Sequence, residues 1–147
     1  MSETEADALE AHRAALRALE ARDHTRASLA ARLAGRGLDE QACAEVVERL
    51  VRAGYVDDRR FAQGRASVLA ARGAGDALIR DDLLRQGVPE EAAAAALASL
   101  EAESDRVARL VAARGRSART VRLLAAKGFA AESLEALVAE IEEGAVG

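Results

Sequence analysis

The side chains best suited to chemistry lie in one short segment, GYVDDRRFA at residues 54–62. It holds two adjacent aspartates, two adjacent arginines and two of the three aromatic residues of the chain. Adjacent carboxylates are typical of acid–base catalysis or of a metal site, and an aromatic ring beside arginines is typical of a nucleic-acid contact. A structural interpretation competes with both, because an aspartate at a helix start accepts hydrogen bonds from free backbone N–H groups and meets the positive end of the helix dipole.

The neighbouring pattern favours the structural interpretation. Gly54 closes one predicted helix, and Phe61 faces inward from the first turn of the next. Asp57 and Asp58 then lie at the N-terminus of that helix as caps, and the two arginines that follow them point outward. We therefore expect neither catalysis nor metal binding from the aspartate pair.

No other combination of residues indicates catalysis. His12 and His24 have no partner at a metal-ligand spacing and are expected to be exposed. Gly73-Ala-Gly75 lacks the Gly-x-x-x-x-Gly-Lys-Ser/Thr pattern of a phosphate loop and is interpreted as a turn between helices. Cys43, the only cysteine, falls at a core position of a predicted helix. We expect no enzymatic activity, no cofactor and no metal site.

The composition indicates an intracellular protein. Half of the 147 residues are apolar, few of these are large, and the net charge is −4. A single cysteine excludes an intrachain disulfide and fits a reducing cytosol. The acidic N-terminus does not resemble a signal peptide, and no apolar run approaches the roughly 20 residues that span a bilayer. We expect a soluble, cytoplasmic protein without membrane contact, and a monomer, because nothing in the sequence suggests an obligate dimer.

Three helix ends repeat along the chain and indicate a tandem organisation. Gly37, Gly87 and Gly128 each follow a polar or basic residue and precede one apolar residue. This is the pattern of a helix C-cap, in which glycine adopts the left-handed conformation and the next apolar side chain folds back on the helix. After each glycine, apolar residues at relative positions 0, 3, 4 and 7 mark one face of an α-helix. They are Cys43, Val46, Val47 and Leu50; Ala93, Ala96, Leu97 and Leu100; and Leu134, Leu137, Val138 and Ile141.

Two further helices precede each glycine, and strand-like alternation is not sustained anywhere. Their predicted ranges are 5–22 (with Leu9, Leu16 and Leu19), 26–35 (Leu29, Leu33), 59–71 (Phe61, Val68, Leu69), 77–85 (Leu78, Ile79, Leu83), 106–113 (Val107, Leu110, Val111) and 118–127 (Val121, Leu124). The predicted N-caps are Thr25, Asp39, Asp76 and Ser117, with Pro89 in a first helical turn. The sequence therefore predicts an all-α fold of three tandem three-helix repeats, at 1–53, 54–103 and 104–147, forming an elongated, curved array.

With the repeats in place, the central segment resembles the RecX family of bacterial regulators of the RecA recombinase. The resemblance rests on GYVDDRRFA at 54–62, RGAG at 72–75 and IRDDLLRQGV at 79–88, and with the outer repeats it covers roughly residues 11–142. The residues that match the family motif are Gly54, Tyr55, Asp57, Asp58, Phe61, Gly75, Ile79 and Gly87. The turn GAGD departs from the pattern, since the family usually has an aromatic residue before the second glycine and a proline after it. The linker of the third repeat is also short.

The resemblance implies a non-enzymatic helical-repeat protein that binds the RecA–DNA filament, along its helical groove. Such a protein would inhibit the ATPase activity and strand exchange of RecA and favour loss of the filament in recombination and DNA repair. Family members are also linked to direct contact with DNA, which makes single- or double-stranded DNA a further expected partner.

The charges are strongly segregated along the chain. Residues 106–128 hold seven basic residues and no acid, between acidic segments at 89–105 and 129–147 that hold five acids each and no base. The i, i+3 spacing puts Arg106 with Arg109, and Arg119 with Arg122, on shared helix faces. Arginine binds phosphate or carboxylate in bidentate fashion, so this segment suits either DNA or an acidic protein surface. Alternatively, its arginines pair with the acidic helices on either side.

Two groups of basic residues are therefore candidate contacts with RecA or DNA. The second repeat contributes Arg59, Arg60, Arg65, Arg72 and Arg80, and the third contributes Arg106, Arg109, Arg114, Arg116, Arg119, Arg122 and Lys127.

Two other functions remain open from the residues themselves. Three-helix units resemble helix-turn-helix modules, so the chain could be a tandem helical protein that acts directly on DNA. It could also be a general helical scaffold for an acidic partner. The scarcity of aromatic residues argues against binding of single strands by base stacking.

Overall fold

The structure, a computed structural model, describes the backbone of residues 1–146 and the side chains of residues 1–144. Within this range it consists of nine α-helices without a strand, which confirms the predicted all-α class. The helices are α1 (Glu3–Ala21), α2 (Arg26–Ala34), α3 (Glu40–Arg52), α4 (Asp58–Ala71), α5 (Asp76–Arg85), α6 (Glu90–Ala98), α7 (Glu103–Arg114), α8 (Ala118–Ala126) and α9 (Ala131–Val146).

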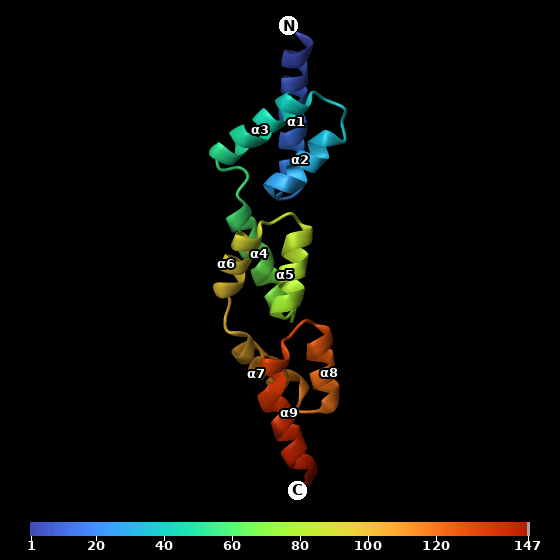
Figure 1. Ribbon diagram of the computed structural model, residues 1–147, viewed down its shortest axis with the longest axis vertical. Helices are drawn as coiled ribbons and strands as arrows, with labels where there is room; N and C mark the ends of the chain where they lie inside the picture. Colours follow the sequence, from blue (N-terminus) through green and yellow to red (C-terminus); the bar gives the residue numbers. More distant parts are fainter. Residues whose placement is uncertain (147) are drawn as a thin grey trace.

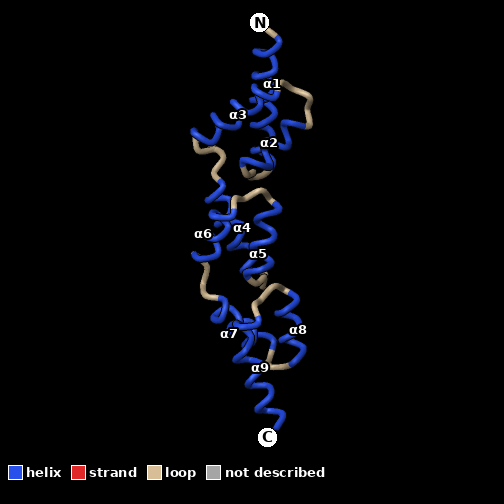
Figure 2. Tube along the Cα trace, in the orientation of Figure 1, coloured by secondary structure: helices blue, strands red, loops and turns tan. Residues whose placement is uncertain are grey.

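The helices form three groups of three along one long axis (Figure 1). We call α1–α3, α4–α6 and α7–α9 the first, second and third helix groups. They follow one another from the N-terminus at one end to the C-terminus at the other, with short loops between the helices (Figure 2). The array is elongated, as expected, and in this view it runs nearly straight rather than along a marked curve.

Each helix group has its own hydrophobic core. In the first group, alanines of α1 pack against Leu29 and Leu33 of α2 and the apolar face of α3. In the second, Phe61, Ile79 and Leu83 pack against alanines of α6. The core of the third group has fewer buried residues: Val107, Leu124, Phe129, Leu134 and Leu137.

The first helix buries a different face from the predicted one. Leu9 and Leu16 were expected on the apolar stripe, but they are 43% and 37% exposed. The buried residues of α1 are Ala11, Ala14, Ala15 and Ala18. A face of small side chains allows another helix to approach closely, so packing against α3 outweighs the stronger hydrophobic signal of leucine. Three further residues of the predicted stripes are also exposed, namely Val68, Leu78 and Val138.

Most predicted caps are present. Four side chains accept the backbone N–H three residues on, at the starts of α2, α3, α4 and α8: Thr25, Asp39, Asp57 and Ser117. The prediction for Asp76 is wrong, because Gly75 is the cap residue of α5 and Asp76 is its first helical residue. Pro89 is likewise the cap residue of α6 and precedes its first turn.

Gly87 and Gly128 directly follow the cap residues of α5 and α8 and close these helix ends, as the sequence predicts. Gly37 differs, because the cap residue of α2 is Gly35, two residues earlier. Gly37, Gly87 and Gly128 have φ angles of +73°, +88° and +90°. The apolar residue after Gly87 and Gly128 is buried in each case, and the backbone N–H of that residue closes the helix end by donating to a carbonyl five residues back. Gly54 has the same left-handed conformation, with φ +84°.

The second helices of the three groups meet end to end. The Gly75 N–H at the start of α5 donates to the Lys127 carbonyl at the end of α8, over 2.7 Å. The Thr25 hydroxyl at the start of α2 donates to the Gln86 carbonyl at the end of α5, also over 2.7 Å. Figure 1 shows α2, α5 and α8 along the same side of the array. Their dipoles therefore align head to tail, which favours this stacking.

The predicted exposure of the histidines is wrong. His24 is 2% exposed, beside the junction of the first two helix groups, and its Nδ1 lies 2.9 Å from the Ser28 hydroxyl. Burial, followed by the charges of Arg22 and Arg32, lowers the pKa of His24 below its usual 6.5. His12 is half-buried on α1. Histidine carries an apolar ring as well as polar nitrogens, so exposure cannot be inferred from residue type alone.

Candidate partner-binding surface

The paired aspartates join two helix groups. The Asp57 carboxylate accepts the Arg60 backbone N–H over 3.1 Å, as a cap of α4. The Asp58 carboxylate reaches across to the first helix group and accepts the Arg26 backbone N–H at the start of α2, over 2.8 Å. The structural interpretation of both residues is therefore confirmed. The contact of Asp58 with a helix 32 residues earlier in the chain could not be read from the sequence.

Two absences hold for the residues that the structure describes. They contain no group of three or more His, Cys, Asp or Glu side chains that could hold a metal ion. None of their helices is both long and apolar enough to cross a membrane.

Two of the candidate arginines in the second helix group form ion pairs with α6. Arg59 pairs with Glu91 over 3.2 Å, and Arg80 pairs with Glu90. All four side chains are 45% or more exposed. Exposed pairs of this kind contribute about 0–1 kcal/mol and exchange easily for another anion. Both arginines therefore stay accessible to a partner.

Three other candidates line one groove at the junction of the first two helix groups. Arg60, Arg65 and Arg72 lie on one face of α4, and Arg22 approaches from the end of α1. We call this hollow, of about 450 Å³, the junction groove; its remaining lining residues are Asp23, Phe61, Gly64, Val68 and Leu69. The sequence analysis did not identify Arg22, which reaches α4 only through the junction between repeats, or Gly64, which belongs to α4 but has no side chain to mark it.

The arginines of the junction groove differ in how they are held. Arg65 forms a two-pronged ion pair with Asp82 of α5, and its hydrogen bond holds the pKa of that carboxyl below the usual range. Arg60 donates to the Gly54 carbonyl over 3.0 Å. Arg22 donates to the backbone carbonyl of Asp23. Within residues 1–144, Arg22, Arg60 and Arg72 form no ion pair with a carboxylate, so their charge is available to a partner.

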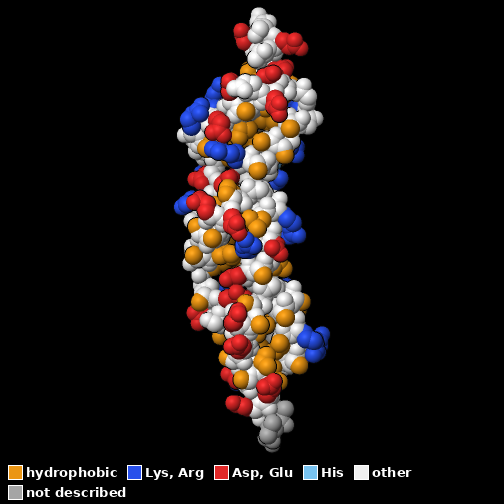
Figure 3. All heavy atoms as spheres, in the orientation of Figure 1, with side chains coloured by type: hydrophobic (Ala, Val, Ile, Leu, Met, Phe, Trp, Pro, Cys, Tyr) orange, Lys and Arg blue, Asp and Glu red, His pale blue; other side chains and the backbone are white. Residues whose placement is uncertain are grey.

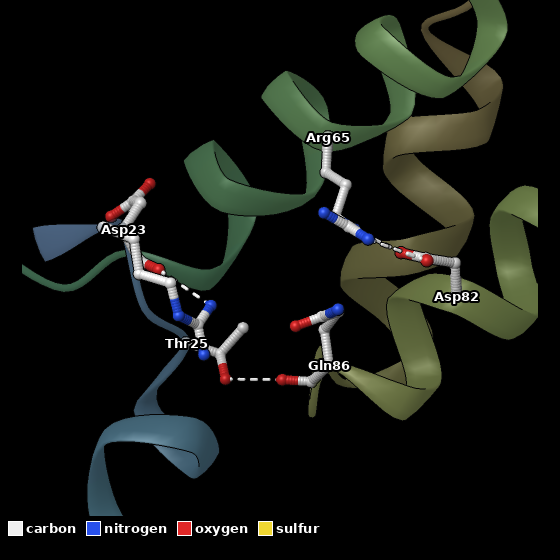
Figure 4. A network of polar contacts seen from close by, with 6 residues as sticks. Asp23, Thr25, Arg65, Asp82 and Gln86 are labelled. Carbon is white, nitrogen blue, oxygen red and sulfur yellow. Dashed lines mark hydrogen bonds and ion pairs between the residues drawn. The ribbon is translucent and has the colours of Figure 1, made fainter. Parts of the chain in front are cut away.

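Figure 4 shows how this junction is assembled. Thr25 of the first helix group points at the main chain of Gln86, while Arg65 and Asp82 face one another on the adjoining α4 and α5. Asp23 belongs to the loop that leads out of α1 and precedes Thr25 there. The groove is therefore bounded by two helix groups, and its shape depends on how they meet.

Arg106 does not belong to an exposed basic face. It is 6% exposed and lies in the junction of the second and third helix groups. Its Nη1 donates to the Asp76 carboxylate over 2.5 Å, its Nη2 donates to the Ala74 carbonyl, and its guanidinium carbon lies 5.4 Å from the centre of the Phe129 ring. The prediction that Arg106 and Arg109 form one binding face is wrong, since Arg109 is exposed and pairs with Glu101.

The remaining basic residues of the third helix group divide into paired and unpaired ones. Arg116 pairs with Glu140 of α9 over 3.1 Å, so pairing with a flanking acidic helix holds for this residue, whereas Arg109 pairs with Glu101 in the loop before α7. Lys127 is half-buried at the end of α8. Three exposed arginines have no ion pair among residues 1–144 and surround a hollow with Ser117 and Thr120 at the start of α8: Arg114, Arg119 and Arg122.

The face seen in Figure 3 alternates acidic and basic side chains, with hydrophobic side chains between them. Basic side chains stand out over α8, at the lower right of this view. Among the candidate residues of the second and third helix groups, the junction groove and the hollow at the start of α8 are two separate basic surfaces. Both can bind anions by the bidentate geometry of arginine.

The other motif residues are structural. Phe61 and Ile79 are buried in the second core, and Gly87 caps α5. A Cβ atom on Gly75 would lie 2.3 Å from the Gly128 carbonyl carbon, so the absence of a side chain lets α5 rest on α8. Tyr55 is 61% exposed beside the first junction and remains available to a partner.

Two family models match this chain. The model described as RecX, first three-helix domain, matches residues 11–50, and the one described as RecX, second three-helix domain, matches residues 57–97. Among curated relatives, the Regulatory protein RecX of Mycobacterium sp. (strain KMS) is 44% identical over 106 residues, which cover 69% of this chain and 57% of the relative. That of Stenotrophomonas maltophilia (strain R551-3) is 37% identical over 95 residues, 65% of this chain and 58% of the relative. The match thus spans little more than half the length of these relatives.

Solved structures share the whole architecture. The crystal structure of RecX from Lactobacillus salivarius superposes with a TM-score of 0.79 at 18% identity, over 94% of this chain and 98% of that one. A second crystal structure of a regulatory protein RecX gives a TM-score of 0.75 at 19% identity, over 89% and 72%. At these identities the superpositions establish the fold, including the third helix group that lies beyond the two matched domains.

Proposed function

This chain belongs to the RecX family, and on that premise we propose that it is a regulatory protein that binds RecA–DNA filaments. It mainly inhibits the ATPase and strand-exchange activities of RecA and shortens the lifetime of the filament. Its three repeats, residues 1–53, 54–103 and 104–147, follow the filament one after another.

The observation that carries the proposal is the junction groove. Three of its arginines, Arg22, Arg60 and Arg72, lack a carboxylate partner within residues 1–144 and lie together at the boundary of two helix groups. The DNA in such a filament carries one negative charge per phosphate, and arginines without a carboxylate partner on an elongated body suit such a target.

The test is ATP hydrolysis by the cognate RecA on single-stranded DNA, titrated with this protein. We expect inhibition well below the concentration of DNA sites. The variant Arg60→Glu/Arg72→Glu should need about tenfold more protein for the same inhibition, because two attractive contacts become repulsive. The matched control Arg49→Glu/Arg52→Glu reverses two exposed arginines of α3 and should inhibit like the wild type.

Three outcomes decide the proposal. Inhibition by the wild type and the control, with a weakened groove variant, supports it. Inhibition only near saturation of the DNA would instead indicate competition for the strand. No effect of the wild type at any ratio would overturn the proposal.

The hollow at the start of α8 favours a second candidate function, direct binding to DNA. Arg114, Arg119 and Arg122 surround two hydroxyl side chains there, and all three lack an ion pair within residues 1–144. This lining carries three positive charges and two hydroxyl groups, which suit a phosphodiester backbone. RecA-independent, salt-sensitive binding to bare DNA would support this second function.

A further inference from the structure

The exposed face of α4 contains a glycine, Gly64, that neither the backbone conformation nor a close contact requires. Gly64 lies in the middle of this helix, where glycine costs roughly 0.5–1 kcal/mol relative to alanine. Its φ angle is not positive, and a Cβ atom built on it would have no atom within 4 Å. Gly75, Gly87 and Gly128, by contrast, each lie where a Cβ atom would meet another segment of the chain. Nothing in the described chain uses the space that Gly64 leaves open.

The junction groove combines this open position with an apolar surface. Val68, one turn beyond Gly64, is 48% exposed, and Leu69 and Phe61 border the same hollow. The lining therefore combines the exposed apolar side chain of Val68 and the open position at Gly64 with four arginines and one acidic residue, Asp23. A long apolar side chain of a partner could lie over Gly64 and Val68 with its flanking groups near Arg22 and Arg72.

The two basic surfaces differ in the number of apolar side chains that line them. The hollow at the start of α8 is lined by arginines and hydroxyl groups, apart from one leucine. The junction groove has a valine, a leucine and a phenylalanine between its arginines. A sugar–phosphate backbone gains little from exposed aliphatic carbon, whereas an acidic peptide with one aliphatic side chain satisfies both the charge and the apolar area.

We propose that the junction groove binds an extended acidic peptide segment through one aliphatic anchor residue. The anchor lies over Gly64 and against Val68, and carboxylates on either side of it pair with Arg22, Arg60 and Arg72. The assignment rests on the proposed function only in that it gives the groove to the protein component of the filament; the peptide contact itself requires neither RecA nor DNA.

The experiment measures fluorescence anisotropy of a labelled short acidic peptide with one central leucine, titrated with the full chain. A matched peptide carries serine in place of the leucine, and a labelled single-stranded oligonucleotide serves as the competing class of ligand. We expect the serine peptide to bind about tenfold more weakly than the leucine peptide.

Substitutions at Gly64 distinguish an effect on peptide binding in the groove from an effect on folding. Gly64→Leu fills the open position and should weaken the leucine peptide about tenfold or more, while Gly64→Ala should change binding much less. Both replacements remove a helical glycine at a site with room for a side chain, so neither should unfold the protein. Helical circular dichroism and the melting temperature verify this. Arg22→Glu/Arg72→Glu should abolish peptide binding, and Arg49→Glu/Arg52→Glu should not.

Each failure has its own meaning. Equal binding of the leucine and serine peptides, or full binding by Gly64→Leu, would overturn the anchor. Loss of the oligonucleotide rather than the peptide in the Gly64→Leu variant would assign the groove to nucleic acid. If the protein inhibits RecA but binds no peptide, this inference is wrong and the proposed function stands. If it binds the peptide without affecting RecA, the proposed function is wrong and the peptide-binding groove stands.

Discussion

Arg106 of α7 and Asp76 of α5 form an ion pair across the junction of the second and third helix groups, with 2.5 Å between Nη1 and Oδ1. The arginine side chain is 7% exposed and the aspartate side chain 38%. The same guanidinium also holds the Ala74 carbonyl and lies over the Phe129 ring. One side chain thus connects α7, the turn before α5 and the loop after α8.

Replacing Arg106 should destabilise the protein rather than merely weaken a binding surface. Arg106→Met leaves the Asp76 carboxylate and the Ala74 carbonyl without their donor, and because Asp76 is partly exposed the expected loss is about 1–3 kcal/mol. The measurement is urea unfolding. Arg119→Met is the control, since Arg119 is exposed and a surface change of this kind stays within about 0.5 kcal/mol. Equal stability of the two variants would contradict the structural role of Arg106.

The close approach of α5 and α8 predicts a strong effect of one methyl group. Gly75→Ala would place a Cβ atom 2.3 Å from the Gly128 carbonyl carbon and 2.5 Å from its oxygen, and this backbone cannot move aside without separating the two helix groups. We expect a loss of about 3 kcal/mol in the free energy of unfolding. Gly64→Ala adds the same methyl group to an open helical position and should instead stabilise by about 0.5–1 kcal/mol. Thermal melts of both variants decide, and a stable Gly75→Ala protein would refute the contact.

The buried His24 predicts that stability falls in weak acid. Because the folded state lowers the pKa of His24 below 6.5, the unfolded chain binds its proton more readily. The free energy of unfolding should therefore decrease as the pH falls below 6.5, by at most about 1.4 kcal/mol per pH unit, until folded His24 is also protonated. Above 6.5 this contribution is constant.

Urea unfolding between about pH 5 and pH 8 measures this decrease. The His24→Gln variant lacks the titrating group, so the difference between the two curves isolates His24 from His12 and from the carboxyl groups. A difference that does not change with pH across this window would show that His24 is not protonated preferentially in the unfolded chain.

The hollow at the start of α8 predicts a change in salt dependence. The slope of log affinity against log salt is negative and steepens by about 0.7 to 0.9 for each phosphate contact. If Arg119 and Arg122 each contact one phosphate, the variant Arg119→Glu/Arg122→Glu should make the slope less steep by about 1.4 to 1.8. Binding of a labelled oligonucleotide at several salt concentrations gives the slope. Arg49→Glu/Arg52→Glu has the same change in net charge and should keep the wild-type slope. Equal slopes for both variants would exclude this hollow as a phosphate contact.

The local features of the fold could be predicted from the sequence. Gly87 and Gly128 close their helices because the left-handed conformation and the return of one apolar side chain depend only on neighbouring residues. Thr25 and Asp57 act as N-caps for the same reason. These signals, repeated three times, also suffice for the fold class.

The binding candidates were predicted less well, because pairing between repeats depends on distances that the sequence does not contain. Arg106 and Arg119 look alike in the sequence, as arginines near a helix start, yet one is buried against Asp76 and the other is exposed. Arg22 lies 38 residues before Arg60 and shares a groove with it only because the end of α1 meets α4.

The sequence by itself therefore determined the helices, their caps, the tandem repeat and the family, since each of these depends on residues close together in the chain or on a specific motif. The tertiary structure decided which arginines remain free, which alanines form the core of the first helix group and where Gly64 leaves a groove open. Burial and ion pairing are properties of neighbours in space, and the stacking of one helix group on the next selects those neighbours.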